Sequence, residues 1–507
     1  MKSKIYTINE LAAICKQLKK KDKKIVHCHG VFDLVHPGHI RHLKAAKKFG
    51  DILIVSLTED KYVNKGPGRP IFNAKLRAEN IAALEFVNYV TINHAPKAMP
   101  AIKAIKPNFF VRGQDHKNFH ESISGGIIKE KKEVEKYGGE LVFTEEIQFS
   151  SSNIINQQLS QNEDQVNAYL TKMRKQISFK EIRKIFSVIM NYKVLVIGDV
   201  ILDEYQFVSP LGKASKSTTI TAKMEQRELY AGGIIAIANH IADFVKNVDL
   251  IANYGLNSQK DYSEFIKSKL HKNVTWYPVY FPDRPTTLKR RFIEPTFDHK
   301  IFETIEINDS PLNDKQKAKL YKCMKKVKNY DLALIGDFGH GFLQPDILEP
   351  IKRKSKFIAI NSQTNSANFG FNLLTKYKTC EYFTIDEREA QYALHNKYIN
   401  PPKALKELID TLSSHLGTIT LGVNGCLVAN KDHQHCITPS FTNNVVDTIG
   451  AGDAFFAVTS LLAKALCSLE VVGFIGNATG ALACQILGNK SYIRKDILLK
   501  YLKTLLA

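Results

Sequence analysis

Two short segments suited to binding phosphate lie near opposite ends of this chain and limit how it can fold. The first runs from Gly30 to His39 (GVFDLVHPGH), and the second runs from Asp447 to Asp453 (DTIGAGD). Glycine-containing turns of this kind present backbone N–H groups to a phosphate at the start of a helix. The chain has 507 residues, too many for one ordinary core, and a prior of about 100–200 residues per domain gives two to four domains. We therefore expect at least two domains, each with a phosphate site.

Apolar runs alternate with amphipathic stretches through the first 111 residues. The continuous apolar runs are typical of buried parallel strands, and the amphipathic stretches predict helices on both faces of the sheet. The expected helices are residues 1–24, 39–49, 74–84 and 96–105, and the expected strands are residues 24–29, 52–57, 89–92 and 109–111.

The composition turns polar at residues 157–179, which separates this pattern from a second α/β pattern that starts with a strand at 194–197. In the second part, residues 218–230 and 287–307 show the alternation of β-strands and predict a small sheet or lid. We predict an α/β protein with a Rossmann-like domain at 1–160, a linker at 161–184, and a doubly wound domain with a small β lid at 185–507.

The chain is strongly basic, with a formal net charge of +21. Its lysines are spread along the sequence without a nucleic-acid-binding motif, so we expect anionic phosphate ligands and no nucleic acid partner. No apolar run reaches the roughly 20 residues that cross a bilayer, and the first 24 residues do not resemble a signal peptide. We expect a cytoplasmic protein without membrane insertion.

The N-terminal segment places two imidazoles, His36 and His39, at the positive start of a predicted helix. Gly38 permits close approach of the backbone to a ligand. Imidazoles in this position can stabilise the charge that builds on the phosphates when an α–β phosphate bond breaks, without a covalent intermediate. The alternative is that they are two solvent-exposed turn histidines.

The surroundings of these histidines favour the first interpretation, because residues 25–156 resemble the cytidylyltransferase-like nucleotidyltransferases. The resemblance rests on GVFD at 30–33, the basic helix that follows, RGQD at 112–115 and FSSSN at 149–153. It implies that His36 and His39 bind the phosphates and the transition state. Many members carry Ser-Thr-Thr and a later basic residue where this chain has Ser-Ser-Ser and Asn156, so the basic contact is unassigned. The other nucleotide-binding residues that it implies are Gly30, Phe32, Gly38, Lys44, Lys47, Arg112, Asp115, Ser150, Ser151 and Ser152.

The C-terminal segment precedes an apolar helix predicted at 454–466. Its glycines let successive N–H groups converge on a phosphate at the helix start. Asp453 then lies beside this anion site, where it can take a proton from an attacking hydroxyl. Phosphoryl transfer of this kind depends mainly on positioning and charge stabilisation.

The same segment is the signature of the ribokinase-like (PfkB) sugar kinases, which residues 185–507 resemble. The resemblance implies a carbohydrate kinase that uses ATP and Mg²⁺ and that could form a homodimer through the small sheet. It assigns phosphate binding to Thr448, Gly450, Ala451 and Gly452. It assigns sugar binding to Asp199, Asp203, Gly232, Gly233, Lys289 and Arg291, and metal binding to Asp337 and Glu389.

The kinase part departs from its family in two places. Residues 361–365 read NSQTN where many of these kinases have Asp-Pro-Lys-Gly, and residues 386–389 read DERE where they have Asn-x-x-Glu. The added aspartate changes the local charge by about one unit and could alter metal binding. The alternative is therefore a kinase fold that binds ligands but turns over poorly.

Taken together, the two halves resemble the bifunctional ADP-heptose synthesis enzymes, although the order of the domains is reversed here. The resemblance implies phosphorylation of heptose 7-phosphate at carbon 1, followed by transfer of a nucleotide from ATP, with CTP as another candidate. The product would be a nucleotide-activated sugar for lipopolysaccharide or another glycan. One alternative is a nucleotidyltransferase for another sugar or alditol phosphate with a weak or regulatory kinase domain. A third hypothesis is a non-catalytic scaffold or nucleic-acid-binding protein.

Overall fold

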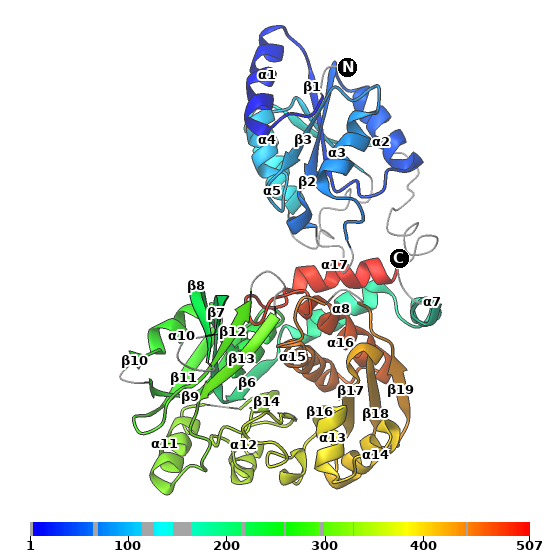
Figure 1. Cartoon of the computed structure of the whole chain (residues 1–507). Helices are drawn as coiled ribbons and strands as arrows, with labels where there is room; N and C mark the ends of the chain where they lie inside the picture. The colour runs from blue at the N-terminus through cyan, green and yellow to red at the C-terminus, as the bar shows by residue number, and fades with distance from the viewer. Residues whose placement is uncertain are drawn as a thin grey trace. The chain divides into compact units, whose positions relative to one another are not determined.

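A computed structural model describes residues 4–63, 69–113, 126–144, 164–213, 219–257, 260–294, 299–327, 329–442 and 445–507. The chain divides into two compact units, residues 1–167 with 499–507 and residues 168–498. The predicted α/β class is confirmed in both units (Figure 1). The domain boundaries remain a prediction, and the described part of the predicted linker is helical, with α7 (Asp164–Gln176) and the start of α8 (Phe179–Ile189).

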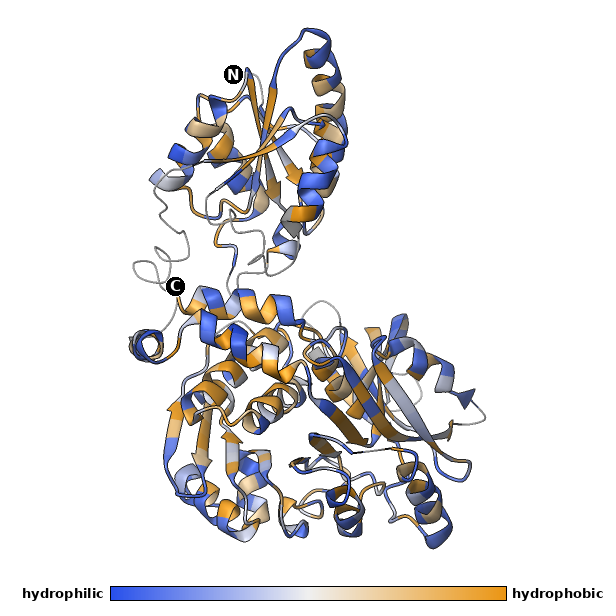
Figure 2. Cartoon of the chain, turned by 180° about the vertical axis from the view of Figure 1, so that it is seen from behind, coloured by the Kyte–Doolittle hydropathy of each residue, from blue (hydrophilic) through white to orange (hydrophobic). Residues whose placement is uncertain are grey.

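The first unit is a parallel sheet of five strands in the order β3-β2-β1-β4-β5. Buried residues of β1 and β2 form the centre of its core, and the strands are the most hydrophobic part of this unit in Figure 2. The strands are β1 (Ile25–Gly30), β2 (Ile52–Thr58), β3 (Tyr89–Asn93), β4 (Phe109–Gly113) and β5 (Glu140–Thr144). The helices are α1 (Ile8–Lys20), α2 (Pro37–Lys47), α3 (Ala74–Ala82), α4 (Met99–Ile105), α5 (Gly126–Glu135) and the 3₁₀ turn η1 (Asp60–Tyr62).

The first helix is shorter than predicted at both ends. Thr7 and Glu10 form a capping box in which each side chain binds the other's backbone N–H, so the helix begins at Ile8. The backbone leaves the helical conformation just after Lys20, and Asp22 has a φ of 53°. The prediction of one helix over 1–24 was therefore wrong in extent because periodicity does not locate caps.

The second unit has a large sheet of ten strands and a separate sheet of four strands. The large sheet follows the order β10-β9-β6-β14-β15-β16-β17-β18-β19, and β11 pairs with β9 outside this path. The strands from β9 to β17 are parallel along this order, and β18 and β19 extend the sheet antiparallel. These strands are β6 (Lys193–Gly198), β9 (Asn247–Asn257), β10 (Lys260–Asp261), β11 (Val274–Phe281), β14 (Leu332–Asp337), β15 (Ile358–Ser362), β16 (Tyr382–Asp386), β17 (Leu416–Thr420), β18 (Cys426–Asn430) and β19 (His435–Thr438).

The four-stranded sheet is the predicted lid, in the order β13-β12-β7-β8. Its strands are β7 (Val200–Lys213), β8 (Ile220–Gly233), β12 (Thr287–Glu294) and β13 (His299–Glu306). The alternation at 218–230 and 287–307 correctly indicated three of these strands. The fourth, β7, begins two residues after β6 ends, so Asp203 lies on the lid and not on the large sheet.

The helices of the second unit include two almost fully buried ones, α15 (Ala451–Lys464) and α16 (Leu469–Ala483), which pack against each other. Burial of α15 along most of its length fixes the helix whose first turn carries Asp453. Besides α7 and α8, the others are α9 (Ile234–Ala242), α10 (Ser263–Lys269), α11 (Asp314–Met324), α12 (Leu348–Lys352), α13 (Glu387–Ala393) and α14 (Pro401–Thr411), with 3₁₀ turns η4 (Pro345–Ile347), η5 (Leu374–Lys376) and η6 (Gly422–Asn424). The last helix, α17 (Lys495–Leu505), begins in the second unit, and its residues from 499 on belong to the first.

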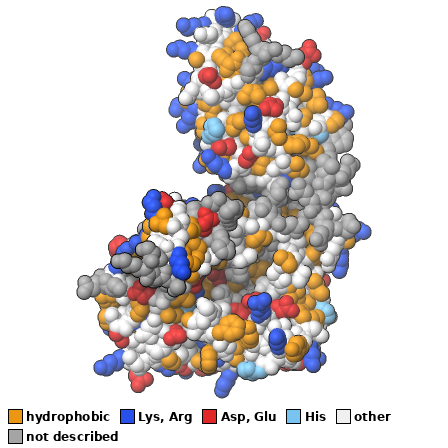
Figure 3. Space-filling model, in the orientation of Figure 1, with side chains coloured by type: hydrophobic (Ala, Val, Ile, Leu, Met, Phe, Trp, Pro, Cys, Tyr) orange, Lys and Arg blue, Asp and Glu red, His pale blue; other side chains and the backbone are white. Residues whose placement is uncertain are grey.

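Two surface properties bear on the predicted partners. Lys and Arg side chains are scattered over the face drawn in Figure 3, as the spread of lysines along the sequence predicts. No helix within the described ranges has both the length and the apolar character that a bilayer span requires.

Candidate active sites

The first candidate site forms where β1 leads into α2. His36 is the N-cap of α2 and Pro37 is its first residue, where a missing N–H costs nothing. The Nδ1 atom of His36 accepts a hydrogen bond of 3.1 Å from the backbone N–H of Gly38. A neutral imidazole that accepts at Nδ1 must carry its proton on Nε2, so His36 presents Nε2 as a donor.

His39 lies against His36 and Phe32. The two imidazole rings stack with centroids 4.0 Å apart, and the Phe32 ring meets His39 edge-on at 5.1 Å. Gly30 makes room for this arrangement, because a Cβ atom there would lie 2.9 Å from the Phe32 ring. Five predicted residues, Gly30, Phe32, His36, Gly38 and His39, thus come together at one helix start.

A buried arginine that the site prediction did not use holds the strand ends below these histidines. The Arg77 guanidinium is fully buried and donates to the carbonyl oxygens of Val31, Thr58 and Phe72 and to the Asp60 carboxylate. Because it connects the loop after β1 with the end of β2, Arg77 fixes the frame in which the histidines lie.

Three basic residues that were predicted to bind nucleotide have other partners. Lys44 and Lys47 lie about 10 Å or more along α2 from its start, at a rise of 1.5 Å per residue. Lys47 donates to the Asp51 carbonyl and to Asn88, and the Lys44 ammonium lies 5.7 Å from the Phe86 ring centroid. The structure therefore does not bring these lysines to the histidines, since they occupy the opposite end of the helix.

Arg112 is also engaged within the protein. Its Nη2 atom lies 2.6 Å and 2.8 Å from the two carboxylate oxygens of Glu130, and Nη1 donates to the His29 carbonyl at 3.0 Å. These bonds position Arg112 at the end of β4 but use most of its donors. Asp115, Ser150, Ser151 and Ser152 lie outside the described residues, so their predicted roles stay predictions.

The second candidate site forms at the start of α15. Gly450 is the N-cap, with a φ of 81° that favours glycine, and Asp453 lies in the first turn. The Ala451 N–H donates to the Thr448 carbonyl at 3.2 Å, so this N–H already has a partner within the turn. The helix start remains the positive end that an anion would approach.

Asp447 fastens the loop that carries these residues. Its carboxylate accepts hydrogen bonds from the backbone N–H of Ile449 at 3.2 Å and of Gly488 at 3.0 Å. It also accepts from Lys300 of β13 at 3.0 Å and from the Tyr205 hydroxyl at 3.4 Å. The first aspartate of DTIGAGD is thus structural, and it ties the loop to two lid strands.

Asp453 is almost fully buried, with 7% of its surface exposed. Burial raises the pKa of its carboxyl from an ordinary value near 3.8 to about 6, and the charge of Asp203 acts in the same direction. A hydrogen bond of 2.7 Å from Gln363 and the charge of Lys289 oppose this rise in pKa. A carboxylate with this pKa is mostly ionised at pH 7, and its pKa lies close enough to the working pH for it to act as a general base.

The predicted sugar-binding acid Asp203 is held by two donors and lies close to Gly232. Arg291 donates to Asp203 Oδ1 at 2.5 Å, and the Asn489 side chain donates to Oδ2 at 3.1 Å. A Cβ atom at Gly232 would lie 2.2 Å from Oδ2 of Asp203. A Cβ atom at Gly450 would lie 2.6 Å from the Asn489 oxygen, so Asn489 touches both the phosphate loop and the sugar-binding acid.

We expect Gly232→Ala to lower kcat/KM for the sugar acceptor by about tenfold or more, because the added methyl group overlaps Asp203 and Asn489. The control is Gly480→Ala on α16, where a Cβ atom would have no neighbour within 4 Å. Steady-state kinase assays with varied acceptor, together with thermal melts of both proteins, measure the effect. Unchanged acceptor kinetics in Gly232→Ala would contradict the assignment of this turn to the acceptor site.

Lys289 is the basic residue most available to a ligand. It has no hydrogen-bond or ion-pair partner among the described residues, whereas Arg291 also donates to Glu303 at 2.7 Å. Burial lowers the pKa of the Lys289 ammonium, against the opposing charges of Asp203, Glu303 and Asp453. An unpaired ammonium close to the general base suits a phosphate group better than the paired guanidinium does.

The remaining predicted sugar-binding residues lie around the start of the lid. Asp199 is fully buried between β6 and β7 and accepts from the Phe338 N–H at 3.2 Å. Burial and the charge of Asp337 raise the pKa of Asp199 to about 7. Gly233 has a φ of 57° at the N-cap of α9, where it completes the turn that Gly232 begins.

The two predicted metal ligands already have partners within the protein. Asp337 already accepts from the Tyr377 hydroxyl at 2.7 Å and pairs with Lys376. Glu389 accepts from the N–H groups of Thr364 and Asp386, and burial together with the charge of Asp386 raises the pKa of its carboxyl. Within the described residues, no group of three or more His, Cys, Asp or Glu side chains could hold a metal ion. Hydrogen-bonded carboxylates can still bind a metal ion, so the role of Asp337 and Glu389 as metal ligands stays a prediction.

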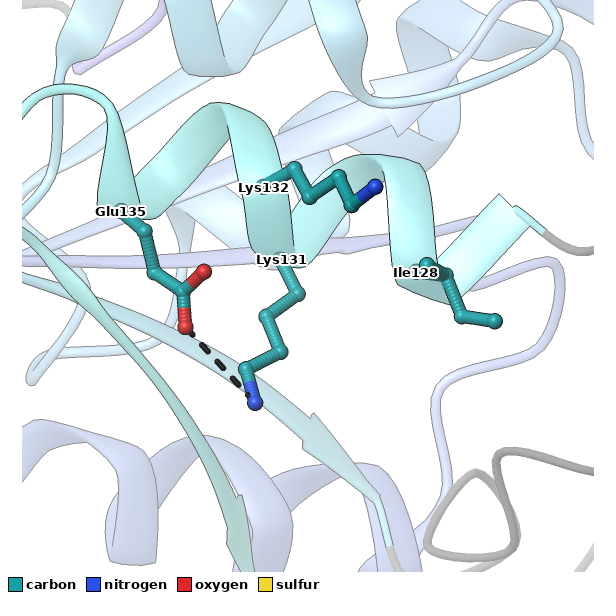
Figure 4. Close-up of a pocket in the computed structure, with 4 residues that line it drawn as sticks. All are labelled: Ile128, Lys131, Lys132 and Glu135. Atoms are coloured by element: carbon teal, nitrogen blue, oxygen red, sulfur yellow. Dashed lines mark ion pairs between the residues drawn. The ribbon is translucent and has the colours of Figure 1, made fainter.

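A cavity of about 270 Å³ lies in the first unit. Its described lining residues all come from α5: Ile128, Lys131, Lys132 and Glu135 (Figure 4). Lys131 and Glu135 form an ion pair of 3.6 Å within it. None of the predicted site residues that the structure describes is among these four residues.

Comparison with known proteins connects these two sites to families. Residues 191–494 match the pfkB family carbohydrate kinases, and this match covers more than half of the chain. The chain belongs to the pfkB carbohydrate kinase family. Residues 27–157 match the cytidylyltransferase-like family. Both family resemblances noted in the sequence are confirmed.

Curated relatives of this pfkB-family chain include proteins named bifunctional protein HldE. The one from Sulfurimonas denitrificans is 44% identical over 109 residues, which are 21% of this chain and 23% of that protein. The one from Geotalea uraniireducens is 37% identical over 139 residues, 27% of each chain. The matched region thus spans about a quarter of the length of these relatives.

Solved structures of similar fold include phosphofructokinase-2 from Escherichia coli. Its potassium complex has a TM-score of 0.51 at 16% identity and covers 62% of this chain and 99% of its own. A mutant of the same enzyme has a TM-score of 0.50 at 14% identity with the same coverage. At this identity the likeness supports the fold alone.

The site of this pfkB-family member contains three residues that the sequence prediction missed: Gln363, Asn489 and Lys300. They contact Asp453, Asp203 and Asp447, from which they are separated by 90, 286 and 147 residues. No spacing pattern connects them to the motifs. Only Gln363 could have been noticed, because it lies in the segment that departs from the family.

Proposed function

We propose that this chain is a bifunctional sugar kinase and sugar-1-phosphate nucleotidyltransferase that makes a nucleotide-activated sugar. The observation that carries the proposal is that each half assembles its own catalytic group at a helix start. His36 and His39 stack at the start of α2, and Asp453 lies buried in the first turn of α15. We assign the nucleotidyltransferase to residues 1–160, the kinase to residues 185–507 and the linker to residues 161–184.

In the proposed first reaction, Asp453 accepts the proton of the anomeric hydroxyl of the acceptor. The freed oxygen attacks the γ-phosphorus of ATP, the β–γ bond breaks, and ADP leaves. The start of α15 and the Lys289 ammonium stabilise the charge on the phosphoryl group in transfer. Asp203, oriented by Arg291 and Asn489, binds sugar hydroxyls.

In the proposed second reaction, a phosphate oxygen of the sugar 1-phosphate attacks the α-phosphorus of a nucleoside triphosphate. The α–β bond breaks and pyrophosphate leaves. His36 donates from Nε2 and His39 lies beside it, so both can stabilise charge on the departing phosphates. Mg²⁺ would be bound together with the nucleotide phosphates, and Asp337 and Glu389 are the residues that we propose to hold it in the kinase.

The most specific form of the proposal takes heptose 7-phosphate as acceptor and ATP as the nucleotide for both steps, with CTP as another donor for the second. It is supported by the name of the HldE relatives and by the pairing of a pfkB kinase with a cytidylyltransferase-like domain. We also propose that the protein works in the cytoplasm, where nucleoside triphosphates and sugar phosphates occur, and can form a homodimer through the lid sheet.

Separate assays of the two half-reactions test this function. Full-length protein is supplied with heptose 1-phosphate, or with the heptose 1,7-bisphosphate that the first reaction forms, together with either ATP or CTP, and pyrophosphate release is followed. In parallel, transfer of label from [γ-³²P]ATP to heptose 7-phosphate is measured. Activity in both assays is expected. Pyrophosphate release without phosphorylation of heptose 7-phosphate would favour the alternative in which the kinase domain is weak or regulatory. The raised pKa of Glu389, to which the charge of Asp386 contributes, would then be a physical reason for the weak kinase.

A further inference from the structure

Gln363, one residue after β15, has a backbone fixed on both sides. Its N–H donates to the Asp337 carbonyl at 2.8 Å. Its own carbonyl accepts from the Asn372 side chain at 3.0 Å. The side chain therefore starts from a defined position at the carboxyl end of the large sheet.

The orientation of the Gln363 amide follows from a chain of hydrogen bonds. The Asn361 Nδ2 atom donates to the carbonyl and hydroxyl oxygens of Thr384 at 3.0 Å and 3.1 Å, so the Asn361 oxygen faces away from Thr384. That oxygen accepts from Gln363 Nε2 at 2.9 Å. The same Nε2 atom donates to Asp453 Oδ1 at 2.7 Å, which uses both of its hydrogens.

We propose that Gln363 is a positioning residue for the phosphoryl transfer, which holds the Asp453 carboxylate by one oxygen and leaves the other to take the acceptor's proton. This inference rests on the proposed kinase activity. Asn361 supports it by presenting only an acceptor to Gln363, so that the amide cannot turn its oxygen towards the carboxylate without losing a hydrogen bond. Gln363 lies within the NSQTN segment that stands where many of these kinases have Asp-Pro-Lys-Gly, so a neutral amide contacts the base here.

The charges around Asp453 determine how its pKa responds when the contact with Gln363 is removed. The carboxyl groups near Asp453 are Asp203 on β7 and Glu389 on α13. The cation near Asp453 is Lys289 on β12. The hydrogen bond from Gln363 lowers the pKa of Asp453 and so opposes the rise caused by burial. Because the base must be ionised, kinase kcat/KM should fall as the pH drops through about 6.

Two substitutions at Gln363 should move this acid limb in opposite directions. Gln363→Met removes the donor at similar size, so the limb should shift up by about one pH unit. Gln363→Lys places a cation beside the carboxylate, so the limb should shift down by about one unit. A merely structural role would reduce kcat at every pH without moving the limb. Gln17→Met, at an exposed position on α1, is the control.

A second measurement tests Gln363 even if the kinase step is not observed. The Asp453 carboxyl is followed by ¹³C NMR of aspartate-labelled full-length protein, and its signal is identified by its loss in Asp453→Asn. Raised and lowered titration midpoints in the Met and Lys variants support the inference. Unmoved midpoints, or unmoved acid limbs in active protein, overturn it. A wild-type protein that phosphorylates no heptose 7-phosphate but shows the expected midpoints would contradict the proposed function and not the role of Gln363.

Discussion

The Asp453→Asn protein is expected to lose the kinase step by about 10² to 10⁴-fold, the range that a general base contributes. Asparagine has the size of aspartate and can keep a contact with Gln363, but it cannot accept a proton at pH 7. The loss should therefore appear in kcat with little change in thermal stability. The measurement is label transfer from [γ-³²P]ATP to heptose 7-phosphate.

The same preparation contains its own control for folding. Pyrophosphate release with supplied heptose 1-phosphate depends on the other domain and should remain unchanged. Asp432→Asn, at an exposed position between β18 and β19, should leave both activities intact. A kinase rate in Asp453→Asn within tenfold of wild type would mean that another group removes the proton.

The second large effect is expected for His39→Ala, which should slow nucleotidyl transfer by about 10²-fold or more. The substitution removes one of two stacked imidazoles at the start of α2 and one of the groups that can stabilise the departing pyrophosphate. Phosphorylation of the sugar should continue, so the sugar bisphosphate should accumulate. Product analysis by anion-exchange chromatography measures both species.

The matched control for this substitution is His94→Ala. His94 follows β3 in the same unit, and two-thirds of its side chain is exposed beside Glu59. It should lose neither activity, because an exposed ion pair contributes little. If both variants, His39→Ala and His94→Ala, catalysed pyrophosphate release at the wild-type rate, the proposed role of His39 would be wrong.

The sequence predicted most of the α/β framework because buried parallel strands are continuous apolar runs. The predicted strand at 52–57 lies within β2, Ile52–Thr58, and the lid was indicated by alternation in β8, β12 and β13. The strand β5 was not predicted, because its five residues begin with a charged glutamate and most of them are only partly buried. The sequence also did not predict β7, because only one residue, Asp199, separates this strand from β6.

The motifs predicted the centre of each site but not its supports. Gly450 and Asp453 lie together at the start of α15 because they are close in sequence on one local turn. His36 and His39 lie together at the start of α2 for the same reason. The family resemblance assigned Lys44 and Lys47 to the nucleotide, yet they extend from the end of α2 that lies away from the histidines. Gln363 and Asn489 reach Asp453 and Asp203 only through the fold, so spacing could not reveal them.

The central claim is that one polypeptide carries out two successive reactions on one sugar. The most direct test is mass spectrometry of the products of purified full-length protein with Mg²⁺, heptose 7-phosphate and ATP, with and without added CTP. We expect a nucleotide-linked heptose phosphate together with pyrophosphate and ADP, and the nucleotide found in this product identifies the donor. Absence of any phosphorylated or nucleotide-linked product with either nucleotide would contradict the account for this sugar.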